Sequence, residues 1–196
     1  MSQTTILSLS DVTKAAESFL EKFHPSLTLP IPIEDIVERK MRIKLSVVPG
    51  IKDLIGVDAF INVDFEQITI DEYCFTRFPE RTRFSIAHEI GHLMLHREWY
   101  EKHGPKDFKE YLSSHDNIDD KDYKYTEIQA QTFAGLILVP TTLLLKEVEK
   151  RIGKVPRLEA PEVLAPVAQD LLEIFQVSGE VMLRRLQREN IVKSNR

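Results

Sequence analysis

Cysteine, long apolar runs and excess positive charge are all scarce in this sequence. Cys74 is the single cysteine among 196 residues, so the chain cannot form an internal disulfide. No apolar stretch approaches the roughly 20 residues that span a bilayer, and the first ten residues lack the pattern of a secretion signal. The net charge of −5 argues against a generally basic nucleic-acid binder. We therefore expect a soluble, cytoplasmic protein without a membrane partner.

What the sequence does contain is enough apolar material for one core, with 42% hydrophobic and 29% charged residues. Apolar residues recur with helical period from Val12 to Phe23 and predict an amphipathic helix. Ser10 and Asp11 precede that helix and are its candidate N-caps.

Three stretches of alternating apolar residues follow a short predicted helix over residues 33–40. They cover residues 43–47, 55–63 and 68–70. The short connection between the last two favours a hairpin, and its edge is either a docking edge for an extended peptide or a merely structural edge strand. We predict an α+β fold, in which a small, mostly antiparallel three-stranded sheet is covered by helices.

The sequence His88-Glu89-Ile90-Gly91-His92 is the most informative stretch of the chain. Neighbouring apolar residues have helical period, so both imidazoles lie on one helix face and can reach one ion at about 2.0–2.1 Å. Glu89 points to the side, from where it can take a proton from a metal-bound water. The alternative is that the two histidines are structural residues satisfied by hydrogen bonds.

A catalytic zinc ion usually has three protein ligands. The metzincin pattern would place glycine and histidine where this chain has Leu95 and Glu98, so that class is excluded. His96 lies about 80° around the helix from His88, and we expect it to have a supporting or structural role.

A second predicted helix, over residues 125–138, carries a further candidate ligand. Glu127 can supply the third ligand, although most helix glutamates are solvated charges. Gln131, one turn on, can hydrogen-bond one of the ligands. Ala130 and Gly135 are small enough to allow close packing of this helix.

The block RFSIAHEIGHLMLH at residues 83–96, followed by EIQAQTFAGLILVP at residues 127–140, resembles the ImmA/IrrE family of zinc metallopeptidases. The family pattern runs roughly RFTxAHELGHLLLH and then ExEANxFAxxLLMP. The resemblance implies His88, His92 and Glu127 as zinc ligands and Glu89 as the catalytic base. It also implies an intracellular endopeptidase that uses a zinc-bound water and cleaves a regulatory protein, namely a helix-turn-helix transcriptional repressor.

The chain departs from the family pattern at two positions. Gln129 stands where the family often has a second glutamate, and Gln131 stands where it usually has asparagine. If the second acidic position were the ligand, this chain would lack it. We favour Glu127 because it is the only acidic residue left in the block.

Residues 104–125 form a polar stretch between the two blocks and are either a lid or a plain solvated insertion. The sequence does not rank its candidates for stabilising an oxyanion. They are Tyr111, His115, Tyr123 and Tyr125.

The C-terminal tail resembles a helix-turn-helix, with Ser178 as N-cap of its second helix. We divide the chain into a metallopeptidase domain at residues 1–153 and this tail at residues 154–196. The tail has few basic residues, so packing of its helices on the core is favoured over DNA contact.

Two functional hypotheses remain. The first is the zinc endopeptidase, and the second is a non-catalytic module that keeps the fold to bind protein or DNA. Glu89 favours the first, because a scaffold does not need a base.

Overall fold

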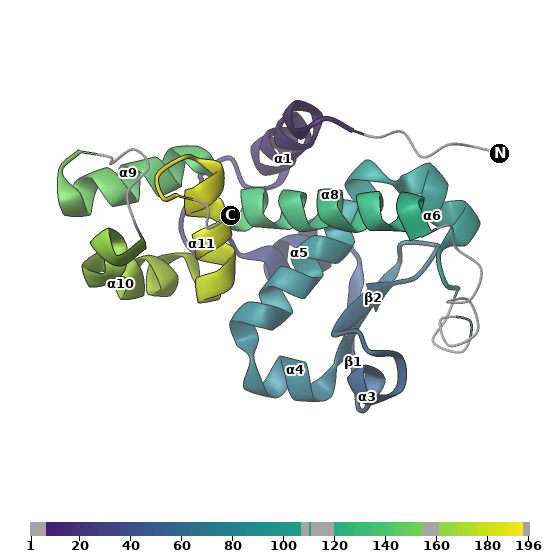
Figure 1. Cartoon of the computed structure of the whole chain (residues 1–196). Coiled ribbons are helices and arrows are strands. Elements are labelled where there is room, and N and C mark those ends of the chain that lie inside the picture. Colours follow the sequence, from purple (N-terminus) through teal and green to yellow (C-terminus); the bar gives the residue numbers. More distant parts are fainter. Residues whose placement is uncertain (1–6, 107–109, 111–119, 155–160, 194–196) are drawn as a thin grey trace.

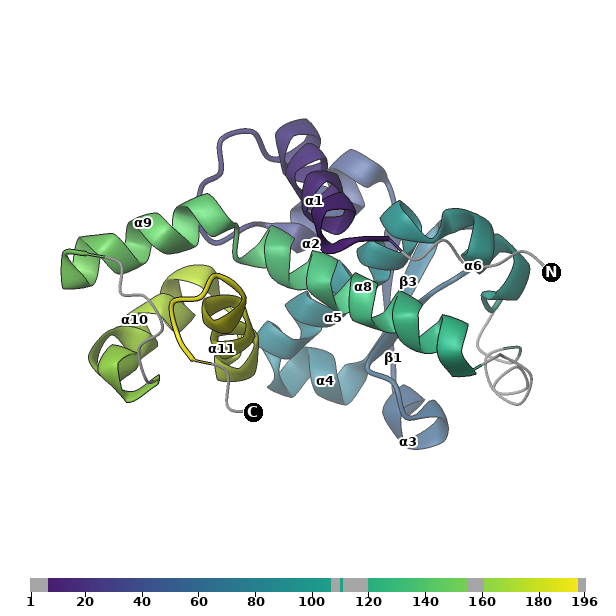
Figure 2. The same ribbon diagram turned by 45° about the horizontal axis from the view of Figure 1, so that its top comes forward.

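Two long helices, α5 (Pro79–Leu95) and α8 (Asp120–Leu138), cross at the centre of the fold (Figure 1). The computed structural model describes residues 7–106, 110, 120–154 and 161–193. It has the predicted α+β class, with a small three-stranded sheet on one side of α5. The helix α1 (Leu9–Phe23) packs against α8 (Figure 2).

The other elements are mostly short. In chain order they are α2 (Ile33–Asp35), the π-helix η1 (Ile36–Met41), β1 (Lys44–Val48), α3 (Ile51–Ile55), β2 (Ala59–Ile61), β3 (Gln67–Asp71), α4 (Glu72–Arg77), α6 (Arg97–His103), α9 (Thr141–Ile152), the 3-10 turn η2 (Pro161–Leu164), α10 (Ala165–Phe175) and α11 (Gly179–Arg188).

The first helix begins earlier than predicted. Ser8 is its N-cap, and the hydroxyl of Ser8 accepts the Asp11 N–H at 3.2 Å. The Asp11 carboxylate in turn accepts the Ser8 N–H at 3.0 Å, which completes a capping box. The assignment of Ser10 and Asp11 as caps was therefore wrong, because they are the second and third residues of the helix itself.

The sheet has the order β1-β3-β2 and is mixed. β2 and β3 form the predicted antiparallel hairpin, whereas β1 runs parallel to β3. The expectation of a mostly antiparallel sheet was wrong in this respect, because alternation along a strand does not encode the direction of its neighbour.

The second strand is also shorter than its apolar pattern. Ile55, the predicted first residue of this strand, is the last residue of the helix α3. The helix is ended by Gly56, which has a left-handed conformation with a φ of 76°. Ile51 of α3 and Phe60 of β2 are buried in a small cluster that stabilises this turn.

Gly91 allows α5 and α8 to approach each other closely. A Cβ atom at residue 91 would lie 2.9 Å from Cα of Ala130 and 3.0 Å from its carbonyl oxygen. The predicted close packing at Ala130 is therefore confirmed. Gly135 lies against Arg185, whose Cδ would be 3.2 Å from an added Cβ.

The C-terminal helices pack beside the C-terminal half of α8 (Figures 1 and 2). The Ser178 hydroxyl accepts the Val181 N–H at 3.3 Å, so the predicted N-cap is confirmed. Arg185 is buried and donates to the Val139 carbonyl at 3.0 Å. The division of the chain at residue 153 stays a prediction.

Two further arginines connect the C-terminal helices to the rest of the chain. Arg188 donates to the Thr132 hydroxyl at 2.9 Å. Arg83 of α5 donates to the carbonyl of Gln176 at 3.2 Å, in the turn between α10 and α11. These contacts show that the described part of the tail packs on the core.

Across the described ranges, no single helix is long and apolar enough to cross a membrane. The bent pair formed by α8 and α9 passes that test of length and composition when the two helices are taken together.

Candidate functional site

Three predicted ligands converge where α5 and α8 cross. The Nε2 atoms of His88 and His92 lie 3.0 Å apart. They lie 3.2 and 3.1 Å, respectively, from the two carboxylate oxygens of Glu127. Atoms bound tetrahedrally to one zinc ion at about 2.0–2.1 Å would be about 3.3 Å apart. The distances between these atoms are therefore close to those expected around one metal ion, and the group could hold one.

The protonation of His92 and Glu127 also suits a metal. Burial lowers the pKa of His92 to about 4, which leaves the neutral imidazole that binds metals. Burial alone would raise the pKa of Glu127, but hydrogen bonds from His88 and His92 outweigh it and lower that pKa. For His88, burial alone would lower the pKa. The hydrogen bond to Glu127 and the charges of Glu89 and Glu127 outweigh burial and raise the pKa of His88. Glu127 is thus ionised beside the neutral imidazole of His92, and both are in the form that binds a metal.

Glu89 lies beside this group and is buried. Its Oε2 atom accepts the backbone N–H of Ile61, in β2, at 3.0 Å. Burial raises the pKa of Glu89 to about 7, against the opposing effect of His88. A carboxylate with a pKa near neutrality is suited to general-base catalysis. The Ile61 contact had no signal in the sequence, because it joins residues 28 positions apart.

Gln129 takes part in a structural contact on another side of α8. His96 donates to the side-chain oxygen of Gln129 at 2.8 Å, and the Gln129 amide donates to the Leu7 carbonyl at 3.1 Å. The predicted structural role of His96 is confirmed. The departure from the family pattern at residue 129 therefore lies apart from the group formed by His88, His92 and Glu127.

Gln131 does not have its predicted partner. It is exposed, and in the part of the chain that the structure describes its side-chain oxygen accepts a long hydrogen bond, 3.4 Å, from Arg184. One turn beyond Glu127, Gln131 has passed the two histidines and faces α11 instead. The prediction that Gln131 hydrogen-bonds a ligand was wrong.

The metal-ligand group and Glu89 line a pocket of about 880 Å³. Its walls come from β2, α5, α6, α8 and α11. Of the predicted oxyanion candidates, Tyr123 lines this pocket and Tyr125 does not, whereas Tyr111 and His115 lie outside the described residues. Most of the predicted lid or insertion lies outside them too.

The pocket has further residues that the sequence analysis missed. Tyr100 and His103 line it from α6, which directly follows α5, and Arg184 lines it from α11. Because α6 directly follows α5 in the sequence, its residues could have been predicted to lie near the site. Arg184 had none, because its place depends on how the tail packs.

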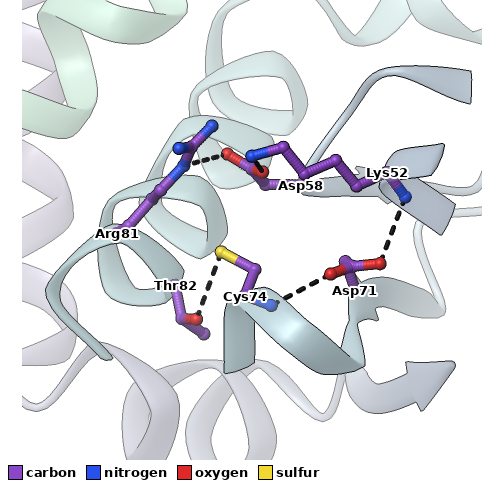
Figure 3. A network of polar contacts seen from close by, with 6 residues as sticks. All are labelled: Lys52, Asp58, Asp71, Cys74, Arg81 and Thr82. Carbon is purple, nitrogen blue, oxygen red and sulfur yellow. Dashed lines mark hydrogen bonds and ion pairs between the residues drawn. The ribbon is translucent and has the colours of Figure 1, made fainter. Parts of the chain in front are cut away.

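A network of polar contacts ties β2 to α5 at one end of the pocket (Figure 3). Asp58, just before β2, forms ion pairs with Lys52 of α3, at 3.0 Å, and with Arg81 of α5. Its carbonyl also accepts the Asp71 N–H at 2.9 Å, which joins it to β3. The start of β2 is therefore fixed relative to α5, as its end is fixed by the bond from Ile61 to Glu89.

The rest of this network anchors α4. The Asp71 carboxylate caps α4 through the Cys74 N–H at 2.9 Å and also accepts the Lys52 N–H at 3.1 Å (Figure 3). The Thr82 hydroxyl lies 3.7 Å from Sγ of Cys74. Burial raises the pKa of Cys74, so this cysteine stays a packed thiol.

Comparison with known proteins now adds the family. The family described as IrrE N-terminal-like domain, Peptidase_M78, matches residues 64–187, which include both sequence blocks together with His88, Glu89, His92 and Glu127. The chain belongs to this family. The match places the group formed by His88, His92 and Glu127 within a peptidase family. The family match also extends through most of α11.

One solved structure shows the same fold in a longer protein. A "Mycobacterium tuberculosis transcriptional regulator" is similar with a TM-score of 0.59 and 15% identity, over 90% of this chain and 55% of that chain. The chain thus spans about half the length of that regulator. At this identity the likeness supports the fold and does not transfer a function. No curated protein matches this chain.

Gly91→Ala is expected to disturb both stability and the metal-ligand group. The added Cβ would meet backbone atoms of Ala130 at 2.9–3.0 Å, so α8 must move and carry Glu127 away from the histidines. We expect the free energy of unfolding to fall by about 1–3 kcal/mol, with weaker zinc binding. Urea denaturation and zinc titration measure both effects.

Gly179→Ala is the matched control, because nothing lies within 4 Å of its added Cβ. Equal stability and zinc affinity of the Gly91→Ala variant and the wild type would contradict the role of Gly91 in helix packing.

Proposed function

We propose that this chain is a zinc-dependent endopeptidase that hydrolyses a peptide bond in a regulatory protein. The observation that carries the proposal is the convergence of His88, His92 and Glu127 beside Glu89 in one pocket. Membership of the IrrE-like peptidase family supports it. The class of substrate, a helix-turn-helix transcriptional repressor, rests on the sequence resemblance alone.

The donor set fits zinc. Two imidazole nitrogens and one carboxylate oxygen form a three-ligand set that leaves a fourth position open. Zinc bound there supplies a Lewis acid, which acidifies water and polarises a carbonyl group. His88, His92 and Glu127 would hold the ion.

Glu89 would move the proton. With Oε2 held by the Ile61 N–H, its other oxygen is left to take a proton from the attacking water. As the water oxygen bonds to the carbonyl carbon and the C–N bond breaks, the same carboxyl group gives the proton to the leaving amine. The hydrogen bond to Ile61 keeps the carboxyl group in one orientation throughout.

The free edge of β2 is where we place the substrate backbone. β2 pairs with β3 on one side and is the outer strand of the described sheet. An extended peptide can add to such an edge through main-chain hydrogen bonds. The Asp58 ion pairs and the Ile61 contact would fix this edge relative to Glu89.

The proposal is tested by cleavage of a proteome-derived peptide library, with new termini identified by mass spectrometry. We expect cleavage by the zinc-loaded protein, loss of cleavage after treatment with a chelator and recovery when zinc is restored. Purified helix-turn-helix repressors are assayed in parallel as intact substrates. Cleavage that ignores the chelator, or no cleavage of either substrate set by the zinc-loaded protein, would contradict the proposed function.

A further inference from the structure

The C-terminal helix α11 forms one wall of the candidate active-site pocket. Its residues Glu180, Val181 and Arg184 line the pocket together with Glu127 and Gln131 of α8. The tail was predicted to be a helix-turn-helix, and its packing turns one face of α11 towards the site. The charged residues on that face are Glu180 and Arg184.

Arg184 differs from the other arginines of α11. Arg185 is buried, and its bonds go to Val139, Thr141 and Glu189. Arg188 bonds Thr132 and does not line the pocket. Arg184 lines the pocket with a side chain that is 60% exposed.

The partners of Arg184 are exchangeable. Its Nη2 atom lies 2.6 Å from a carboxylate oxygen of Glu180, one turn back, and the Glu180 side chain is 72% exposed. Exposed pairs of this kind contribute little to stability. The bond from Nη1 to Gln131 is long, at 3.4 Å. A substrate carboxylate can therefore replace Glu180 on the guanidinium, which binds carboxylates in a planar, bidentate manner.

The bond to Gln131 also places Arg184 along the substrate. Gln131 follows Glu127 by four residues on α8, which corresponds to about 6 Å along the helix axis. An extended peptide advances about 3.3 Å per residue. For a peptide that runs along α8, the guanidinium thus lies about two residues from the bond to be cleaved.

We propose that Arg184 is a specificity-determining residue, which selects substrates with Asp or Glu about two residues from the scissile bond. Glu180 occupies the guanidinium in the free protein and competes with the substrate carboxylate. This inference rests on the proposed peptidase function for its cleavage readout. Its binding readout is independent of cleavage.

The cleavage test uses the peptide library and three variants. The wild type is expected to prefer Asp or Glu at the stated distance. Arg184→Glu should lower kcat/KM for acidic peptides by about tenfold or more and shift the preference towards Lys or Arg. Glu180→Ala should raise kcat/KM for acidic peptides a few-fold. Opposite effects from two members of one ion pair are not expected of a merely structural pair.

Arg39→Glu is the matched control. Arg39 pairs with Asp35 at 3.1 Å, also four residues apart and exposed, but it does not line the pocket. The control should cleave with the wild-type preference. Zinc content should be the same in all four proteins, because none of these substitutions touches the metal-ligand group.

The binding test uses fluorescently labelled alanine-rich decapeptides with one Asp or one Lys, and Glu89→Gln protein with and without Arg184→Glu. We expect the Asp peptide to bind more tightly and Arg184→Glu to remove that preference. Two results would overturn the inference whatever the cleavage assay shows. One is the same affinity for the Asp peptide in Glu89→Gln protein with and without Arg184→Glu. The other is tighter binding of the Lys peptide by Glu89→Gln protein that keeps Arg184. Absence of cleavage together with an Arg184-dependent preference for Asp would overturn the proposed function alone.

Discussion

Glu89→Gln is expected to bind zinc and fold like the wild type while kcat falls by about 10²–10⁴-fold. The amide has the same shape as the carboxylate, and its oxygen can still accept the Ile61 N–H. It cannot take a proton from water at neutral pH. The metal-ligand group is untouched, since Glu89 is not among its three members. Cleavage rates and zinc content of the same preparation measure both parts.

Glu98→Gln is the control for this substitution, because Glu98 lies exposed on the neighbouring helix α6 and does not line the pocket. It should retain the wild-type rate. Equal cleavage rates for Glu89→Gln and the wild type would contradict the general-base mechanism. Loss of zinc from Glu89→Gln would instead assign Glu89 a role in holding the metal.

His92→Ala and Glu127→Ala are expected to have the second large effect, on metal affinity. His92 is buried and Glu127 contacts both histidines, so either substitution removes one of three donor atoms. Loss of a ligand should weaken zinc binding by more than the 10- to 100-fold typical of residues that only support ligands. Competition with a fluorescent zinc chelator measures the affinity.

Gln129→Ala separates the two readings of the family pattern. Gln129 bonds His96 and Leu7 rather than the metal-ligand group, so its loss should change zinc affinity far less than the loss of Glu127. Unchanged zinc affinity in Glu127→Ala would show that Glu127 is not the third ligand. A loss in Gln129→Ala as large as that in Glu127→Ala would contradict the separation of the two positions.

Local pattern was sufficient for the elements that carry the site. Helical period around residues 84–94 predicted that His88 and His92 share a face, and the structure brings their Nε2 atoms to 3.0 Å. Glu127 could be predicted as the third ligand from its place on a predicted helix and from the family resemblance. Its position against the histidines depends on the crossing of α5 and α8, which Gly91 allows.

Contacts between distant segments were beyond the sequence pattern. Alternation does not show that β1 pairs with β3 in parallel, and the apolar residue Ile55, predicted to begin a strand, ends a short helix instead. Gln131 was expected at a ligand because both helices were considered without α11. The tail supplies its partner, Arg184, across 53 residues of sequence.

Elemental analysis of the purified native protein, beside His92→Ala and without added metal, tests the central claim most directly. We predict about one zinc per wild-type chain and none in the variant, because the ligand atoms of His88, His92 and Glu127 all lie within 4.8 Å of one another and can reach one ion. Zinc retained equally by both proteins would place the metal elsewhere. No zinc in either, even after zinc is supplied, would contradict a metallopeptidase and favour a regulator that keeps the fold.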